Sequence, residues 1–186
     1  RAICFDDNQY QLDNHLVKTP SWASVQRFFS EVQRPSTVPG YYQPLTMTSL
    51  MLDVAMGGRP GNLRPFHRTS LALHVLNTLL VIGLLYLLFR QPIVAVMAGL
   101  LFGLHPLQVE PVAWATGMKD LLCGLLALTA LWQYATFATA TRRRARHYAL
   151  ATIALAIALF AKPAAVAVPL IALVIDVMLL QRTWRQ

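Results

Sequence analysis

The chain has 186 residues, of which 56% are hydrophobic and only 13% are charged. Soluble domains carry about 25% charged residues, so this composition excludes an ordinary water-soluble domain. The net charge of +8 does not indicate nucleic-acid binding, because the arginines lie mostly at the ends of apolar segments and four of them cluster at 142–146. A basic patch between two apolar segments leaves no room for a nucleic-acid recognition fold. The lipid bilayer is therefore the expected partner, and nucleic acid is not.

Residues 1–66 differ from the rest of the chain and predict a water-facing loop, because they hold five of the eight acidic residues and six prolines. Thr19-Pro20 predicts the start of a helix of about twelve residues. This helix could lie at the membrane interface or pack on the rest of the loop. A second short helix is expected at 45–56, before a glycine-rich loop. In the first of these two helices, the apolar residues recur at helical spacing: Trp22, Val25, Phe28, Phe29 and Val32.

Residues 67–186 predict an all-α, polytopic membrane bundle. Hydrophobic segments are expected at about 67–89, 92–104, 121–137, 148–161 and 164–180. A bilayer core of about 30 Å requires about 20 helical residues. The second and fourth segments fall short of this length, and each ends at a residue–proline step, His105-Pro106 or Lys162-Pro163.

Orientation follows from arginines after the first, third and fifth segments, which mark the cytoplasmic side. The first 66 residues form a long loop, and long loops are translocated largely regardless of charge. They therefore share the outer face with 105–120 and with Lys162. Because the two short segments stop early at that face, the sequence predicts an outward-open cavity. Its expected lining is His105, Glu110, Lys119, Asp120 and Lys162.

Three acidic residues could carry chemistry on the outer face. Asp6 and Asp7 could be catalytic carboxylates, or a solvated pair at a helix end. Glu110 lies among apolar residues at the expected membrane boundary, where an ionisable group often has a function. It could equally be an interfacial glutamate that reaches water.

Basic and polar residues near the same face have alternative interpretations. Lys119 and Asp120 could form an internal pair. Lys162 could hold a phosphate, or it could extend its ammonium group to the membrane surface. His74 and Asn77 are expected to hydrogen-bond between helices.

The remaining signals are weaker. Asp176 is expected to pair locally, and Cys123 is expected to pack as a small hydrophobic residue. No spacing of His, Cys, Asp or Glu forms a convincing metal site. The sequence therefore predicts no cofactor, with a divalent metal left open.

Several motifs in order resemble the membrane domain of the transmembrane and tetratricopeptide-repeat O-mannosyltransferase family and its bacterial relatives. They cover nearly the whole chain: Phe5-Asp6-Asp7, Tyr41-Tyr42-Gln43-Pro44-Leu45, Phe66-His67, His105-Pro106 to Glu110, Lys119-Asp120-Leu121 and Lys162-Pro163. The resemblance implies the C-type glycosyltransferase fold, whose members use polyprenyl-phosphate sugars as donors. It also implies a membrane helix before Arg1, further helices after Gln186 and tetratricopeptide repeats.

The resemblance assigns roles to individual residues. Asp6 or Asp7 takes the place of the proposed catalytic base, and Glu110 matches the acid of the second outer loop. The family commonly has arginine where this chain has Gln43. If that arginine contacts the donor's phosphate, Gln43 weakens the case for an identical donor site. Lys162, Arg64 or Arg68 could supply a positive charge in place of this arginine, and Lys119 is a further candidate. Tyr41, Tyr42, His105 and Asp120 are expected to support the site.

The leading hypothesis is a glycosyltransferase that moves a mannose-like sugar from a polyprenyl phosphate to a hydroxyl acceptor. The acceptor is expected to be protein Ser or Thr, or a glycan, and a single displacement inverts the anomeric centre. The expected location is the bacterial inner membrane with a periplasmic site, or the endoplasmic reticulum membrane in a eukaryote. A non-catalytic membrane anchor for a repeat scaffold is the alternative. A transporter is less favoured, because no internal repeat of helices is evident.

Overall fold

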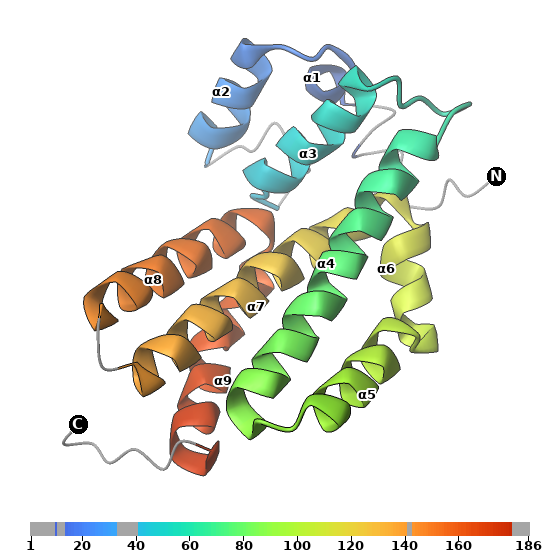
Figure 1. The fold of residues 1–186 in the computed structure, drawn as a ribbon. Coiled ribbons are helices and arrows are strands. Elements are labelled where there is room, and N and C mark those ends of the chain that lie inside the picture. Colours follow the sequence, from blue (N-terminus) through green and yellow to red (C-terminus); the bar gives the residue numbers. More distant parts are fainter. Residues whose placement is uncertain (1–9, 11–13, 33–40, 141–142, 180–186) are drawn as a thin grey trace.

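A computed structural model describes residues 10, 14–32, 41–140 and 143–179. Within these ranges every regular element is helical. The longer helices α4 (Arg64–Phe89), α5 (Pro92–Gly103), α7 (Met118–Thr139) and α8 (Arg144–Ala161) pack in a bundle with α9 (Val168–Val174), and the short helices α1 to α3 (within 15–55) gather at one end (Figure 1). The expected all-α, polytopic membrane fold is confirmed.

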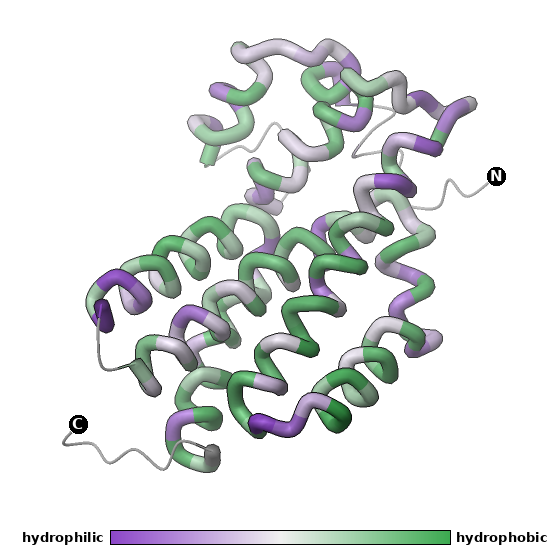
Figure 2. The backbone as a smooth tube through the Cα atoms, viewed as in Figure 1, coloured by the Kyte–Doolittle hydropathy of each residue, from purple (hydrophilic) through white to green (hydrophobic). Residues whose placement is uncertain are grey.

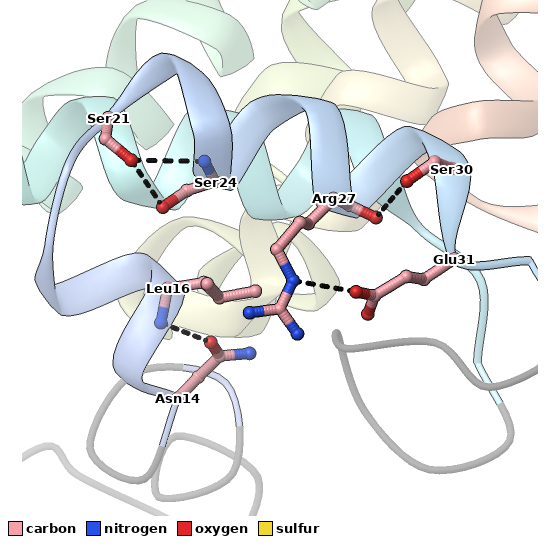
Figure 3. A network of polar contacts seen from close by, with 7 residues as sticks. All are labelled: Asn14, Leu16, Ser21, Ser24, Arg27, Ser30 and Glu31. Carbon is pink, nitrogen blue, oxygen red and sulfur yellow. Dashed lines mark hydrogen bonds and ion pairs between the residues drawn. The ribbon is translucent and has the colours of Figure 1, made fainter.

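Polar side chains cap the N-termini of helices α1 (His15–Lys18) and α2 (Trp22–Ser30) (Figure 3). Asn14 caps α1, and the Ser21 hydroxyl accepts the Ser24 N–H at 3.1 Å to cap α2. The sequence prediction placed this cap at Thr19. Thr19 instead donates to the His15 carbonyl at 2.8 Å, so it closes α1 and cannot begin α2.

The apolar side of α2 is divided between the protein and the surroundings. Phe28 is fully buried, and Phe29 meets the ring of Phe160 from α8 edge-on, with ring centroids 5.9 Å apart. Trp22 is 74% exposed and Val32 is 56% exposed. The helix therefore packs on the protein through one part of the expected stripe and leaves the other part uncovered.

Helix α3 (Pro44–Ala55) matches the expected second short helix and has proline at its first position. It packs through Met47 and Leu50, which share one core with Phe28 of α2, Phe66 of α4 and Met118 of α7. The N-terminal helices are thereby joined to the end of the membrane bundle.

Three described helices are long and apolar enough to cross a membrane. They are α4 (Arg64–Phe89), Ala115–Thr139, which contains α7 (Met118–Thr139), and α8 (Arg144–Ala161). Helix α8 begins four residues before the expected start at 148, because arginine is a good helix former and nothing in 144–147 stops the helix. Its 18 residues make it a full-length candidate span rather than a short one.

The second hydrophobic segment is short, as expected, because α5 ends at Gly103 (Pro92–Gly103). The chain then bends by 52° and continues through a 3-10 turn into α6 (Val109–Ala113). The bent pair would be a fourth crossing if it forms one span. The last segment is interrupted: a 3-10 turn at Pro163–Ala167 precedes α9 (Val168–Val174), and Ile175–Leu179 is a π-helix.

Successive long helices run in opposite directions, so the bundle has two distinct ends (Figure 1). We call one the arginine end, defined by Arg90, Arg143, Arg144 and Arg146. The other is the α3 end, where α1 to α3 and Lys162 lie. Figure 2 shows hydrophobic residues concentrated along the helices of the bundle and hydrophilic ones mostly near its two ends. Arg90 turns the chain between α4 and α5 in the left-handed conformation, with φ of 57°.

Close approach of α4 to α7 depends on a missing side chain at Gly83. A Cβ atom at this position would overlap the indole of Trp132. Replacement of Gly83 by valine is therefore expected to lower the stability of the bundle by about 1–3 kcal/mol, the usual cost of overfilling a packed interior. Thermal unfolding in detergent measures the effect.

The matched control is Gly61→Val, because a Cβ at Gly61 meets nothing within 4 Å. Equal unfolding temperatures for the Gly83 and Gly61 variants would contradict the proposed α4–α7 contact.

Candidate functional site

Helix α3 bridges the ends of two bundle helices at the α3 end. The Thr46 hydroxyl donates to the Ala161 carbonyl at 2.9 Å, which satisfies a backbone acceptor at the C-terminus of α8. The Ser49 hydroxyl lies 3.0 Å from the sulfur of Met118, the first residue of α7. The N-terminus of α7 and the C-terminus of α8 are thus held side by side.

These two helix ends carry an ion pair between Asp120 and Lys162. Asp120 lies in the first turn of α7, and Lys162 follows the last residue of α8. Each charge complements the dipole of its own helix end. The Lys162 ammonium contacts the Asp120 carboxylate, and the side chains are 31% and 42% exposed. The predicted internal pair of Lys119 with Asp120 is therefore not the one observed; Asp120 pairs with a residue 42 positions away.

Lys119 lies beside a second group at the same end. Its ammonium is 5.1 Å from the centre of the Tyr10 ring and 5.6 Å from that of Trp114. The Tyr10 hydroxyl donates to the Oε1 atom of Gln43 at 3.4 Å, and Gln43 is only 3% exposed. A cation, two aromatic rings and an amide from four segments therefore meet next to the Asp120–Lys162 pair.

A groove of about 320 Å³ begins at Asp120 and follows α7 toward the middle of the bundle. Its α7 wall consists of residues at helical spacing, Asp120, Leu121, Gly124, Ala127, Leu128 and Leu131. Residues of α4, α5, α6 and α9 complete it. Three polar residues, Asp120, Asn77 and Gln108, contribute to the wall, and the rest of the lining is apolar. Lys162 contacts Asp120 but does not line the groove.

Asn77 of α4 lies on the groove wall and bonds to α7. Its Nδ2 atom donates to the Leu121 carbonyl at 3.0 Å, and Gly124 leaves the space for this approach. The Oδ1 atom is buried and has no hydrogen-bond partner among the described residues. His74 similarly contacts the Gly103 carbonyl through Nε2, at 2.9 Å. The expected hydrogen bonds between helices are confirmed for both residues.

The other predicted site residues are dispersed. Glu110 is exposed on α6, and exposed His105 accepts the Leu107 N–H through Nδ1 at 3.2 Å. Arg64 and Arg68 are exposed on the first turns of α4. Of the five residues expected to line a cavity, Asp120 is the one that lines this groove.

Two tyrosines, Tyr41 and Tyr42, and the acids Asp6 and Asp7 are also predicted site residues. Tyr42 donates to the Phe29 carbonyl at 2.9 Å and so ties the segment before α3 to α2, while Tyr41 is exposed. Asp6 and Asp7 lie outside the described residues. Asp176 accepts a hydrogen bond at 2.6 Å from Tyr134 of α7, which is 42 positions earlier in the sequence, so this contact joins two helical segments and is not the expected local one. The described residues hold no cluster of three or more His, Cys, Asp or Glu side chains that could bind a metal.

Comparison with known proteins finds O-mannosyltransferases. Over 137 residues, or 71% of its length, the chain is 31% identical to protein O-mannosyl-transferase tmtc2 of Xenopus laevis. Over 136 residues it is 30% identical to TMTC2 of Homo sapiens, and over 111 residues 33% identical to TMTC1 of Mus musculus. The chain belongs with the transmembrane and tetratricopeptide-repeat O-mannosyltransferases and their relatives.

The match to these O-mannosyltransferases is partial in length. It spans 16% of each TMTC2 protein and 11% of TMTC1. No protein-family model matches the chain, and no solved structure matches it significantly.

Sequence reasoning missed three residues that shape the site of this O-mannosyltransferase relative. Tyr10 and Thr46 contact residues 33 and 115 positions away, and no local pattern marks such contacts. Asp53 could have been noticed, because it is an acid in an otherwise uncharged helix with apolar neighbours on either side. It is 1% exposed, and its Oδ1 atom accepts the Thr69 hydroxyl at 2.6 Å, which joins α3 to α4.

Burial raises the pKa of Asp53 above its usual value, and the hydrogen bond from Thr69 opposes this only in part. A raised pKa means that the folded protein favours the protonated acid. The resulting stability is fully present below about pH 4, the pKa of an unfolded aspartate, and is lost as pH rises through the folded pKa. We therefore expect the free energy of unfolding to fall over this range, and Asp53→Asn to flatten the fall.

Unfolding in detergent at a series of pH values measures this dependence. The half-exposed Glu31 provides a control, because Glu31→Gln makes the same chemical change in a residue paired with Arg27 at the surface. An unchanged pH slope in Asp53→Asn would show that another group controls it.

Proposed function

We propose that the protein transfers a mannose-like sugar from a polyprenyl-phosphate donor to a hydroxyl group, with protein Ser or Thr as the acceptor. The observation that carries the proposal is the Asp120–Lys162 pair beside a mostly apolar groove, which Asp120 lines. A polyprenyl-phosphate sugar has a charged head and an isoprenoid tail, and this arrangement offers a cation to the first and an apolar channel to the second. The O-mannosyltransferase names of the relatives support the sugar and the acceptor.

The proposed reaction takes place on the outer side of the membrane. Arg90 caps the C-terminus of α4, and Arg143, Arg144 and Arg146 lie at the N-terminus of α8. These two helix termini are at the same end of the bundle (Figure 1). Arginines in short loops favour the cytoplasmic side, so the α3 end faces the periplasm or the lumen. Lys162 then lies at the outer membrane surface, where the headgroup of a translocated lipid donor is found.

In the proposed mechanism, the acceptor hydroxyl attacks the anomeric carbon while a carboxylate takes its proton. Asp6 or Asp7 is the proposed base. Asp7 precedes Tyr10 by three positions in the sequence, and Tyr10 lies against Lys119 and Gln43. Glu110, on α6, is the proposed second acid of the site.

The leaving group sets the second requirement of the reaction. A polyprenyl phosphate leaves as an anion, so it needs a cation to stabilise the developing charge and no proton donor. Lys162 is the proposed cation, with Lys119, Arg64 and Arg68 as further basic residues at the same end. One displacement without a covalent enzyme intermediate inverts the anomeric centre.

Gln43 favours a second candidate, a non-catalytic membrane anchor. The family resemblance places an arginine at this position, and here an uncharged, buried side chain bonds to Tyr10 instead. Incubation of the purified full-length protein with polyprenyl-phosphate mannose and an acceptor peptide separates the two. Release of polyprenyl phosphate with mannose on the peptide is expected of the enzyme. If the donor stays intact under conditions in which a relative consumes it, the non-catalytic membrane anchor is the candidate that remains.

A further inference from the structure

We propose that Asp120 occupies the place of the donor's phosphate on Lys162 and is displaced when the donor binds. The inference rests on the proposed function, because it concerns the same lipid phosphate. It adds a role for Asp120 as an internal competitor, which holds the cation in position while the site is empty and gives it up to the ligand.

The geometry supports an exchange because the pair is accessible and each partner is fixed by its own helix. Asp120 is held in the first turn of α7 and lines the groove. Lys162 adopts an extended backbone conformation between α8 and Pro163, and Thr46 anchors the preceding carbonyl. Both side chains are partly exposed, so a ligand can reach them without unfolding either helix.

The charges make simultaneous occupancy unfavourable. A carboxylate and a phosphate are both oxyanions, and each binds an ammonium group through short, charge-assisted hydrogen bonds. A phosphate that contacts Lys162 while Asp120 remains bound would lie a few ångströms from a like charge. Such repulsion is substantial near a protein surface, where the effective dielectric constant is about 20. The carboxylate must therefore turn away as the phosphate arrives, so that it weakens binding relative to a neutral residue.

Removal of the Asp120 carboxylate is therefore expected to raise the affinity for polyprenyl phosphate, whereas most substitutions within a binding site lower it. Asp120→Asn should bind polyprenyl phosphate about two- to fivefold more tightly than the wild type, which is what release of a partly exposed ion pair supplies. Asp120→Glu should return the affinity to the wild-type value, because it restores the competing charge. Lys162→Met should lose most of the binding.

The test is the affinity of the full-length protein in detergent for polyprenyl phosphate itself. Glu31→Gln is the matched control, since it breaks another ion pair at the α3 end and changes the net charge equally. Asp120→Ser replaces the asparagine variant if the latter does not fold. Weaker or unchanged binding in the neutral variants, with normal wild-type binding, overturns the exchange but leaves the proposed function standing. Absence of wild-type binding overturns both.

Discussion

Replacement of both Asp6 and Asp7 by asparagine is expected to slow sugar transfer by about 10² to 10⁴-fold. This range is the usual contribution of a positioned general base. The amide cannot take the proton of the acceptor hydroxyl, but it is nearly the same size as the carboxylate. Donor binding should therefore change little, and the loss should be found in kcat rather than in KM for the donor. Initial rates with polyprenyl-phosphate mannose and a peptide acceptor measure both quantities.

Single substitutions at Asp6 and Asp7 then identify the base, because only one of them should reproduce the full loss. Asp13→Asn is the control, since it makes the same chemical change in the same segment. If the double variant keeps wild-type kcat while Glu110→Gln loses it, the base lies on α6 instead. If all three substitutions together leave transfer intact, the proposed mechanism is wrong.

Lys162→Met is expected to raise KM for the donor by about 10- to 100-fold. A hydrogen bond to a charged group contributes about 1.5–3 kcal/mol, and methionine keeps the length of the side chain without the ammonium. Because leaving-group charge also develops in the transition state, kcat should fall as well. Lys162→Arg should recover part of both losses, because it restores a cation at the same place.

The control for this experiment is Lys18→Met, which removes an exposed lysine from α1 at the same end of the protein. The ion pair with Asp120 could instead serve only to join α7 to α8. In that case Lys162→Met would lower the unfolding temperature and leave KM unchanged. Charge reversal of both partners, Asp120→Lys with Lys162→Asp, would then restore stability.

The helices were largely predictable, because their cause is local. Apolar runs of sufficient length specify α4 and α7, and proline at the first position marks the start of α3 and α5. Predictions were less accurate where neighbouring residues compete for one role. Thr19 and Ser21 are both capable caps, and the hydrogen bond of Thr19 to α1 decides between them. Arg144 was placed in a loop on account of its charge, although its backbone continues α8.

The candidate site was only partly predictable, because its contacts are long-range. The sequence singled out Asp120 and Lys162 separately, but their pairing depends on the way α7 and α8 are packed together under α3. Burial of Gln43 and Asp53 likewise depends on tertiary packing, since neither position is apolar. The apolar groove has no signature of its own, because its walls use the same residues that face lipid elsewhere in the bundle.

Photo-crosslinking decides whether the lipid donor binds where we propose. A polyprenyl phosphate with a photoreactive group in its tail is bound to the full-length protein in a membrane and irradiated, and the labelled residues are identified by mass spectrometry. We expect labels on the groove walls at Leu128, Leu131 and Ile171, and we expect polyprenyl-phosphate mannose to suppress them. A second apolar hollow of about 390 Å³ lies between α7, α8 and α9, beside Tyr148 and Thr152. Labels confined to that hollow, or labels that the donor does not suppress, would contradict the proposed site.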